Sequence, residues 1–211
     1  MVFRLDKRIL FPPTDLAEDD GLLAIGGDLS QERLLLAYQN GIFPWYSEDT
    51  PIMWYSPHER FVIYAEELHV SSSMKKFLRK EPFVITQNQA FEEVIKACAN
   101  IKRKDQDGTW IVPDMVDAYV NLFKNGHAQS VEVWQKGELV GGTYGIPVKD
   151  VFCGESMFSR VSNASKAALI YLLTSGQYKM IDCQMPTEHL ATLGGRMISR
   201  EEYMQALQNV E

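Results

Sequence analysis

The sequence is poor in cysteine and contains no long apolar run. Its three cysteines, Cys98, Cys153 and Cys183, are far apart, and none belongs to a Cys-x-x-Cys pair. This argues against a disulfide framework or a zinc site and favours a reducing compartment, so we expect a cytoplasmic protein. No stretch approaches the roughly 20 apolar residues that span a bilayer, and the first residues lack the apolar core of a signal peptide. We therefore expect no membrane association.

Positive charge is also scarce, since the net charge is -7. An acidic protein does not attract nucleic acid through its overall field, so any such binding requires a local basic patch. Two candidate clusters are present: Lys75, Lys76, Arg79 and Lys80, and then Lys102, Arg103 and Lys104. From pattern alone, such clusters are more often solvated surface than binding sites. The four histidines have no metal-ligand spacing, so no metal is expected.

The 211 residues can form one large or two small domains. Residues 1–60 are rich in turns and aromatics, and 21–30 is interpreted as a tight turn before a helix that Ser30 caps and that extends to Gln39. Five aromatic residues lie between 43 and 55, where a domain seam and a ligand pocket are equally good explanations. We therefore expect a small, aromatic-rich N-terminal domain over 1–60.

Residues 61–211 alternate between strand and helix patterns, which predicts an α+β fold with a mixed α/β sheet. The expected strands are 61–64, 83–86, 128–135, 138–144, 151–155 and 179–183. Helices are expected over 113–125 and 163–175, and a short one follows 71–73. Another is capped by Asn88 and has Phe91, Val94, Ile95 and Cys98 on its core face. Thr187 caps a short helical turn, and the last helix begins with a capping box of Ser199 and Glu202. Residues 156–160 fit neither strand nor helix.

Polar side chains end two of the expected strands. The strand at 179–183 ends in Asp182, Cys183 and Gln184, and alternation along a strand puts Asp182 and Gln184 on one side. A carboxylate beside an amide can bind and orient an amino group, although a strand end that simply faces water is the commoner case. Glu155, after another apolar strand, could bind a cationic amine. Ser156 lacks the final glycine of a Gly-x-Ser-x-Gly elbow, so a serine hydrolase is not favoured.

Six motifs in series carry a resemblance to a known family. They are GLLAIGGDLS at 21–30, GIFPWY at 41–46, WYSP at 54–57, GTWI at 108–111, FCGESMFS at 152–159 and IDCQ at 181–184. In this order they closely resemble the leucyl/phenylalanyl-tRNA–protein transferases, over nearly the whole chain from about residue 11. The resemblance implies a small N-terminal domain followed, over 61–211, by a catalytic domain similar to the Gcn5-related acetyltransferases.

The resemblance also implies the activity: transfer of Leu or Phe, and less well Met, from aminoacyl-tRNA to the N-terminal Arg or Lys of a protein, which marks that protein for degradation. No metal or organic cofactor is implied, and we expect a monomer. By position, Asp182 and Gln184 resemble the catalytic pair, with Gln184 orienting the attacking amine and Asp182 fixing Gln184 and assisting proton movement. Glu155 would neutralise the basic side chain of the acceptor or hold its amine.

The same resemblance implies the binding residues. Phe152 and Met157 resemble the apolar pocket for Leu or Phe. The aromatic wall for the terminal adenosine of the tRNA, where stacking is worth ~1–3 kcal/mol per base, would consist of Trp110, Tyr119, Trp45 and Tyr38. Lys75, Lys76, Arg79 and Lys80 resemble a basic helix that grips acceptor-stem phosphates.

The sequence departs from the family pattern at a few positions. Ser72 stands where some relatives have Arg, Thr143 replaces a Met near the pocket, Thr187 replaces an Asn, and the helix around Leu172 and Leu173 is shortened. The preference among Leu, Phe and Met is therefore open, whereas the reaction class is not.

Two other functions compete. An acetyl-CoA-dependent acetyltransferase would need a Gln/Arg-x-x-Gly-x-Gly/Ala turn, which the sequence lacks. A non-catalytic RNA-binding module would leave Glu155, Asp182 and Gln184 without a role.

Overall fold

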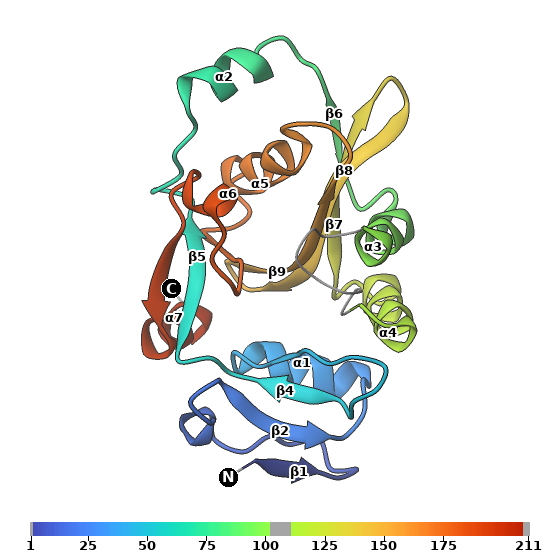
Figure 1. Ribbon diagram of the computed structural model, residues 1–211, viewed down its shortest axis with the longest axis vertical. Helices are drawn as coiled ribbons and strands as arrows, with labels where there is room; N and C mark the ends of the chain where they lie inside the picture. The colour runs from blue at the N-terminus through green and yellow to red at the C-terminus, as the bar shows by residue number, and fades with distance from the viewer. Residues whose placement is uncertain (1, 102–110, 209–211) are drawn as a thin grey trace.

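The structure is a computed structural model that describes residues 2–101 and 111–208. Its strands form two sheets (Figure 1). The smaller sheet has the strand order β1-β2-β4-β3, from β1 (Phe3–Leu5), β2 (Leu22–Gly26), β3 (Phe43–Pro44) and β4 (Met53–Tyr55). The larger has the order β11-β5-β10-β9-β8-β7-β6, from β5 (Glu59–Tyr64), β6 (Val84–Gln87), β7 (Gln129–Gln135), β8 (Glu138–Val148), β9 (Val151–Ser159), β10 (Met180–Asp182) and β11 (Arg196–Ser199).

Helices pack on both faces of the larger sheet. The helices of the described residues are α1 (Gln31–Gln39), α2 (Ser72–Leu78), α3 (Phe91–Asn100), α4 (Pro113–Lys124), α5 (Ala164–Thr174), α6 (Glu188–Ala191) and α7 (Arg200–Gln208), with a 3-10 turn at Thr14–Leu16. Both α5 and α3 contact β7, β8 and β9, and Figure 1 shows these strands between the two helices. Each face therefore has its own apolar core. In the described parts of the chain, no helix is long and apolar enough to cross a membrane.

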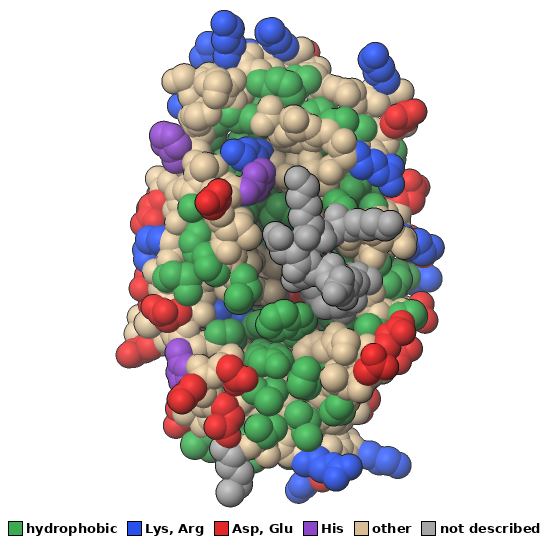
Figure 2. Space-filling model, viewed as in Figure 1, with side chains coloured by type: hydrophobic (Ala, Val, Ile, Leu, Met, Phe, Trp, Pro, Cys, Tyr) green, Lys and Arg blue, Asp and Glu red, His purple; other side chains and the backbone are tan. Residues whose placement is uncertain are grey.

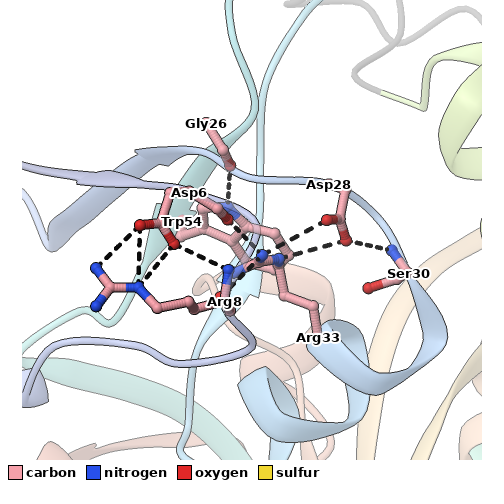
Figure 3. Close-up of polar contacts among 7 residues, drawn as sticks. All are labelled: Asp6, Arg8, Gly26, Asp28, Ser30, Arg33 and Trp54. Atoms are coloured by element: carbon pink, nitrogen blue, oxygen red, sulfur yellow. Dashed lines mark hydrogen bonds and ion pairs between the residues drawn. The ribbon is translucent and has the colours of Figure 1, made fainter.

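A buried arginine, Arg33 of α1, links the segments that follow β1 and β2 to this helix (Figure 3). Its Nη2 donates to the carbonyls of Asp6 and Arg8 at 2.8 and 3.1 Å, and its Nε donates to Oδ1 of Asp28 at 3.3 Å. The indole of Trp54 donates to the Gly26 carbonyl at 2.9 Å. One guanidinium thus ties the N-terminal segment, the loop after β2 and α1 together.

Two local predictions for the N-terminal region are wrong. Residues 21–30, interpreted as a tight turn, contain strand β2, which pairs with β1 and β4. The helix does begin after Ser30, but the Ser30 side chain makes no capping hydrogen bond; instead the carboxylate of Asp28 accepts from the Ser30 N–H at 2.9 Å. Paired glycines at 26 and 27 obscured the strand, because they suggest a turn wherever they occur.

Most predicted elements of the larger unit are confirmed. Phe91, Val94, Ile95 and Cys98 of α3 are all buried, as expected from their helical spacing. The helix starts two residues later than predicted, because the Asn88 side chain accepts from the Ser130 N–H rather than capping it. Residues 156–159, expected to be irregular, continue strand β9, and β11 was not predicted.

Strand β10 is an inner strand of the larger sheet, between β5 and β9. It runs antiparallel to β5, pairing Asp182 with Val62, and parallel to β9, pairing Asp182 with Cys153. Beyond Asp182 strand β10 stops, whereas β9 continues for six residues along β8. The two parallel strands therefore part at this point, and an opening forms between them at the carboxyl end of β10.

Candidate active site

The end of β10 is arranged differently from a regular strand. Gln184 has a φ of 62°, in the left-handed region, so it no longer alternates with Asp182, and the prediction that the two side chains share one strand face is wrong. Oδ1 of Asp182 accepts from the backbone N–H of Gln184 at 2.8 Å. Such an Asx turn stabilises a backbone conformation that residues other than glycine rarely adopt. Asp182 therefore holds the Gln184 backbone rather than its side chain.

The side chain of Gln184 points instead to Glu155 of β9. Its Nε2 donates to Oε1 of Glu155 at 3.1 Å. Glu155 reaches this position through a β-bulge: β8 pairs Tyr144 with Ser156 and Gly145 with Gly154, so Glu155 has no partner of its own. A bulge commonly turns a side chain out of the regular alternation. The expected carboxylate and amide do meet, but the carboxylate that binds the amide is Glu155.

Glu155 is buried among hydroxyl groups. The Tyr119 hydroxyl donates to its Oε2 at 2.9 Å, and the hydroxyls of Tyr38 and Tyr119 are in contact with each other. Burial raises the pKa of Glu155 to about 7; hydrogen bonds from the two tyrosines lower it, while the charge of Asp182 raises it. A carboxylate with such a pKa can accept or release a proton near neutral pH.

Asp182 has a cationic partner that the sequence did not suggest. Nη2 of Arg60, in β5, lies 3.1 Å from Oδ2 of Asp182, and both side chains are almost fully buried. The ion pair neutralises a carboxylate that would otherwise be strongly destabilising in the interior. Only the pairing of β5 with β10 brings these residues together, and no local pattern reports such a pairing.

A cavity of about 560 Å³ opens over these groups. Of the residues expected to contact substrate or perform chemistry, five line it: Trp45, Glu155, Met157, Asp182 and Gln184. Its other walls are mostly apolar and include Phe43, Tyr55, Leu169, Ile181, Met185 and Leu190. Thr143 and Thr187, two of the departures from the family pattern, also line it. This volume and polarity suit a ligand with a medium-sized apolar group.

Other expected contact residues lie behind the cavity wall. Phe152, Tyr38 and Tyr119 are at most 2% exposed and do not line the cavity. The rings of Tyr38 and Tyr119 meet edge to face, with centroids 6.5 Å apart, and Phe152 packs against Tyr178. In this structure the two tyrosines face Glu155 rather than a ligand. Trp110 lies outside the described residues.

The remaining polar neighbours do not form a second reactive centre. Burial raises the pKa of the Cys183 thiol above its usual range, so Cys183 is not an activated nucleophile. Oγ of Ser165 is 3.3 Å from Nε2 of His189, a contact that the sequence did not predict. Within the described residues, no group of three or more His, Cys, Asp or Glu side chains could hold a metal ion.

The first basic cluster lies on and after α2, away from the body of the sheet. Lys75, Lys76, Arg79 and Lys80 are all exposed, and none of them is in an ion pair with another described residue. Lys and Arg side chains gather at this end of the molecule in Figure 2. Positive charge without internal partners remains available to an anionic ligand. The second cluster, Lys102, Arg103 and Lys104, falls outside the described residues.

Comparison with known proteins agrees with this arrangement. The model of the leucyl/phenylalanyl-tRNA protein transferase family matches residues 62–208, and the model of that family's N-terminal domain matches residues 27–58. The leucyl/phenylalanyl-tRNA–protein transferase of Syntrophobacter fumaroxidans is 54% identical over 98% of this chain and 89% of its own length. That of Flavobacterium johnsoniae is 53% identical over 99% of this chain and all of its own length.

Solved structures resemble the chain only weakly. A conserved protein from Bacteroides thetaiotaomicron is 13% identical, covers 73% of this chain and 56% of its own, and has a TM-score of 0.45. AAC(6')-Iy is 14% identical, covers 61% of this chain and 91% of its own, and has a TM-score of 0.35. These likenesses concern the fold alone.

The predicted fold class is confirmed by the two sheets themselves, with a small N-terminal unit before a larger unit built on a mixed sheet. Two family models and relatives about half identical over nearly the full length identify the chain. It belongs to the leucyl/phenylalanyl-tRNA–protein transferase family.

Proposed function

We propose that this protein transfers Leu or Phe, and less readily Met, from aminoacyl-tRNA to the N-terminal Arg or Lys of acceptor proteins, which marks them for degradation. The observation that carries the proposal is the contact between Gln184 and Glu155 inside a largely apolar cavity. The apolar walls suit a Leu or Phe side chain, and the polar pair suits an amine. Membership of the family supports the same reaction.

The reaction is aminolysis of an ester. The α-amine of the acceptor attacks the aminoacyl carbonyl, a C–N bond forms, the C–O bond to the ribose breaks, and the amine proton ends on the ribose oxygen. Because the Gln184 amide donates to Glu155, its carbonyl oxygen is left to accept from the incoming amine; no described residue donates to it. The ester is already activated, so positioning of the amine supplies much of the rate.

Glu155 and Asp182 take different parts in this proposal. Glu155, with a pKa of about 7, balances the charge of the acceptor's N-terminus and can receive its proton. Asp182 acts as an orienting group, because one of its oxygens binds the Gln184 N–H and the other lies against Arg60. Tyr38 and Tyr119 orient Glu155 from behind.

The substrates are assigned to separate surfaces. Met157, with Leu169 and Leu190, would receive the aminoacyl side chain, and Phe152 would support this wall from the core. Trp45 is 39% exposed at the cavity, so it can stack on the terminal adenosine. Lys75, Lys76, Arg79 and Lys80 would contact the phosphates of the acceptor stem.

The proposal includes the organisation of the chain. We propose a division into 1–60 and 61–211, supported by the change from one sheet to the other between β4 and β5. We also propose a cytoplasmic monomer, which is supported by the scarcity of cysteine and by a cavity to which one chain contributes from both sheets.

Transfer of labelled Leu from Leu-tRNA to peptides tests the function. Peptides beginning with Arg or Lys should accept Leu, whereas acetylated Arg should not, because its nitrogen is no longer nucleophilic. Gln184→Ala should reduce transfer about 100-fold through loss of amine positioning. Gln177→Ala, on the surface next to Gln87, is the matched control and should match wild type. Acetylation of the peptides by acetyl-CoA without Leu transfer would replace the proposal with an acetyltransferase, and tRNA binding without transfer would replace it with an RNA-binding module.

A further inference from the structure

Arg60 is buried beside the reacting groups but has no direct part in the proposed reaction. Its guanidinium lies between two aromatic rings, 4.6 Å from the Phe43 centroid and 4.7 Å from the Tyr203 centroid. Nη2 also donates to the Gly41 carbonyl at 3.4 Å. A guanidinium held between two rings is fixed in plane and position, and such contacts are stronger when desolvated.

The partners of Arg60 come from distant parts of the chain. Arg60 belongs to β5, Phe43 to β3 of the small sheet, Tyr203 to α7, and Asp182 to the end of β10. The guanidinium therefore occupies the point at which the small sheet, the last helix and the strand that carries Asp182 meet. Its position defines where the Asp182 carboxylate can rest.

A series of contacts links Arg60, through Asp182, to Gln184 in the cavity. Oδ2 of Asp182 lies against Arg60, and Oδ1 accepts from the N–H of Gln184, so the carboxylate is fixed at both oxygens. Gln184 has a positive φ, and a residue other than glycine keeps this conformation only when its surroundings impose it. From there the Gln184 amide reaches Glu155.

We propose that Arg60 is a positioning residue for aminoacyl transfer: it orients the Asp182 carboxylate, which in turn holds Gln184 in the left-handed conformation that aims its amide at Glu155. The inference rests on the proposed function, because it assigns Gln184 to the amine. Without Arg60, the Asp182 carboxylate is free to turn, and the Gln184 backbone relaxes to an ordinary conformation.

Arginine suits this position better than lysine. Its planar guanidinium stacks on both rings while an edge nitrogen meets the carboxylate, whereas an ammonium is a compact point charge without a plane to stack. Arg60→Lys therefore keeps the charge beside Asp182 but loses the geometry. The two properties can be separated by comparing Arg60→Lys with Arg60→Met.

The experiment measures kcat and KM for Leu transfer to an Arg-peptide, with folding followed by circular dichroism. Arg60→Met should lower kcat about 100-fold with KM for Leu-tRNA within about threefold, since misplacement of reacting groups by about 1 Å has effects of this size. Arg60→Lys should fall between Arg60→Met and wild type. Arg33→Met, which removes the buried arginine of the small sheet, is the matched control and should keep kcat within about threefold of wild type.

Two further measurements separate positioning from a merely structural role. Because the charge of Arg60 lowers the pKa of Glu155, Arg60→Met should move the acidic limb of the pH–rate profile to higher pH. In an Asp182→Asn background, Arg60→Met should lower kcat by less than about threefold, because residues that act through one another are not additive.

Several results would overturn the proposal. One is a wild-type kcat in folded Arg60→Met. Another is a decrease of kcat in Arg33→Met as large as that in Arg60→Met. A third is that the effects of Arg60→Met and Asp182→Asn on the free energy of activation add fully. If Arg60→Met does not fold, wild-type kcat in Arg60→Lys would have the same meaning, because Arg60→Lys loses the geometry of the guanidinium. Absence of transfer by the wild type would contradict the proposed function instead, so the two failures are distinguishable.

Discussion

At the scale of single residues, Glu155 sets the expected pH dependence. Burial raises its pKa to about 7, so the carboxylate that accepts from Gln184 and Tyr119 protonates as the pH falls through neutrality. Transfer should therefore decrease tenfold per pH unit below about 7, measured as kcat/KM with an Arg-peptide. The acceptor's own α-amine, with a usual pKa of about 7.7–8.0, contributes a second limb.

Glu155→Gln separates the two limbs. The variant should be slower at all pH values and should retain only the limb that belongs to the α-amine of the acceptor.

The same carboxyl makes stability depend on pH, but stability falls where transfer rises. The pKa of Glu155 in the folded protein lies above its ordinary value of 4.5, so between pH 4.5 and about 7 the folded protein binds a proton that the unfolded chain has lost. The free energy of unfolding therefore decreases as the pH rises through that window. Chemical denaturation at pH 5 and pH 8 should show this dependence in the wild type and not in Glu155→Gln. If the pH–rate profile of Glu155→Gln keeps the limb near pH 7, Glu155 is not the group whose protonation limits transfer.

The sequence points to candidate site residues only where the signal is local. Asp182, Gln184 and Glu155 all lie at the ends of apolar runs, and the structure brings them to one cavity. Arg60 could not be found in this way, because its importance arises from pairing between strands more than 100 positions apart in the chain. The positive φ of Gln184 was equally hidden, because it depends on the Asx turn that Asp182 forms, and an Asp at a strand end does not by itself predict such a turn.

At the scale of elements, the exposed cations of α2 should provide part of the tRNA affinity. Lys75 and Lys76 are exposed on this helix and have no described ion-pair partner. Lys75→Gln/Lys76→Gln should weaken binding of deacylated tRNA, and the slope of log K against log salt should become shallower by roughly one for each phosphate that the variant no longer neutralises. Filter binding between 50 and 200 mM salt measures both quantities.

The matched control removes the same charge elsewhere. Lys96 and Lys124, on α3 and α4, are also exposed, but both lie against Glu92. Lys96→Gln/Lys124→Gln should leave the salt slope unchanged. Equal slopes in the two double variants would mean that only the net charge matters and that α2 is not the contact surface.

A buried carboxylate joins the start of α3 to the sheet, and its removal should destabilise the protein. Glu132 of β7 is fully buried and accepts from the hydroxyls of Thr86 and Ser130 at 2.5 Å each and from the Ala90 N–H at 3.3 Å. Glu132→Ala leaves these donors without an acceptor, which should reduce the free energy of unfolding by about 2–4 kcal/mol. Glu138→Ala, exposed on the adjoining hairpin, should change it by less than about 0.5 kcal/mol. Urea denaturation compares them, and equal decreases would contradict the assigned role of Glu132.

Elements were predicted well wherever hydrophobic periodicity dominated. The helices at 113–124 and 164–174 and the hairpin of β7 and β8 fall close to their expected bounds. Strand β9 was predicted only over 151–155, because residues 156–160 mix polar and apolar side chains, yet a bulge at Glu155 lets pairing with β8 resume at Ser156. A bulge depends on the partner strand, so single-strand periodicity cannot reveal it.

At the scale of the whole molecule, the two sheets share the cavity. Trp45, from the loop after β3, lines it together with Glu155 of β9 and Gln184 beyond β10. Any rearrangement between the small sheet and the larger one would therefore change the cavity. The sequence leaves a domain seam and a ligand pocket as alternatives for the aromatic stretch at 43–55. The structure shows that Phe43, Trp45 and Tyr55 line a cavity together with residues of the larger sheet. A linear pattern cannot show this, because it does not say which residues of the larger sheet lie opposite the aromatic rings.

Arg200, at the start of α7, connects the two sheets. Its guanidinium donates to the carbonyls of Thr14, Ser56 and Pro57, all in the segment before β5. Arg200→Met should leave these carbonyls without their charged donor and reduce the free energy of unfolding by about 2–3 kcal/mol. Because Trp45 then lies on a less firmly attached sheet, KM for Leu-tRNA should rise more than kcat falls.

Arg196→Met is the matched control for Arg200→Met. Arg196 is four positions earlier and pairs with Glu67 and Glu202 at the surface, where ion pairs contribute about 0–1 kcal/mol. Urea denaturation and transfer kinetics on both variants separate loss of one charge from loss of the connection. If Arg200→Met raises KM no more than Arg196→Met does, the small sheet keeps its place without Arg200. Attachment would then come from the apolar core around Trp54 and Tyr38, which α1 and the small sheet share with α4 and α7. A larger rise in KM for Arg200→Met alone would show that the cavity is completed by a polar connection outside it.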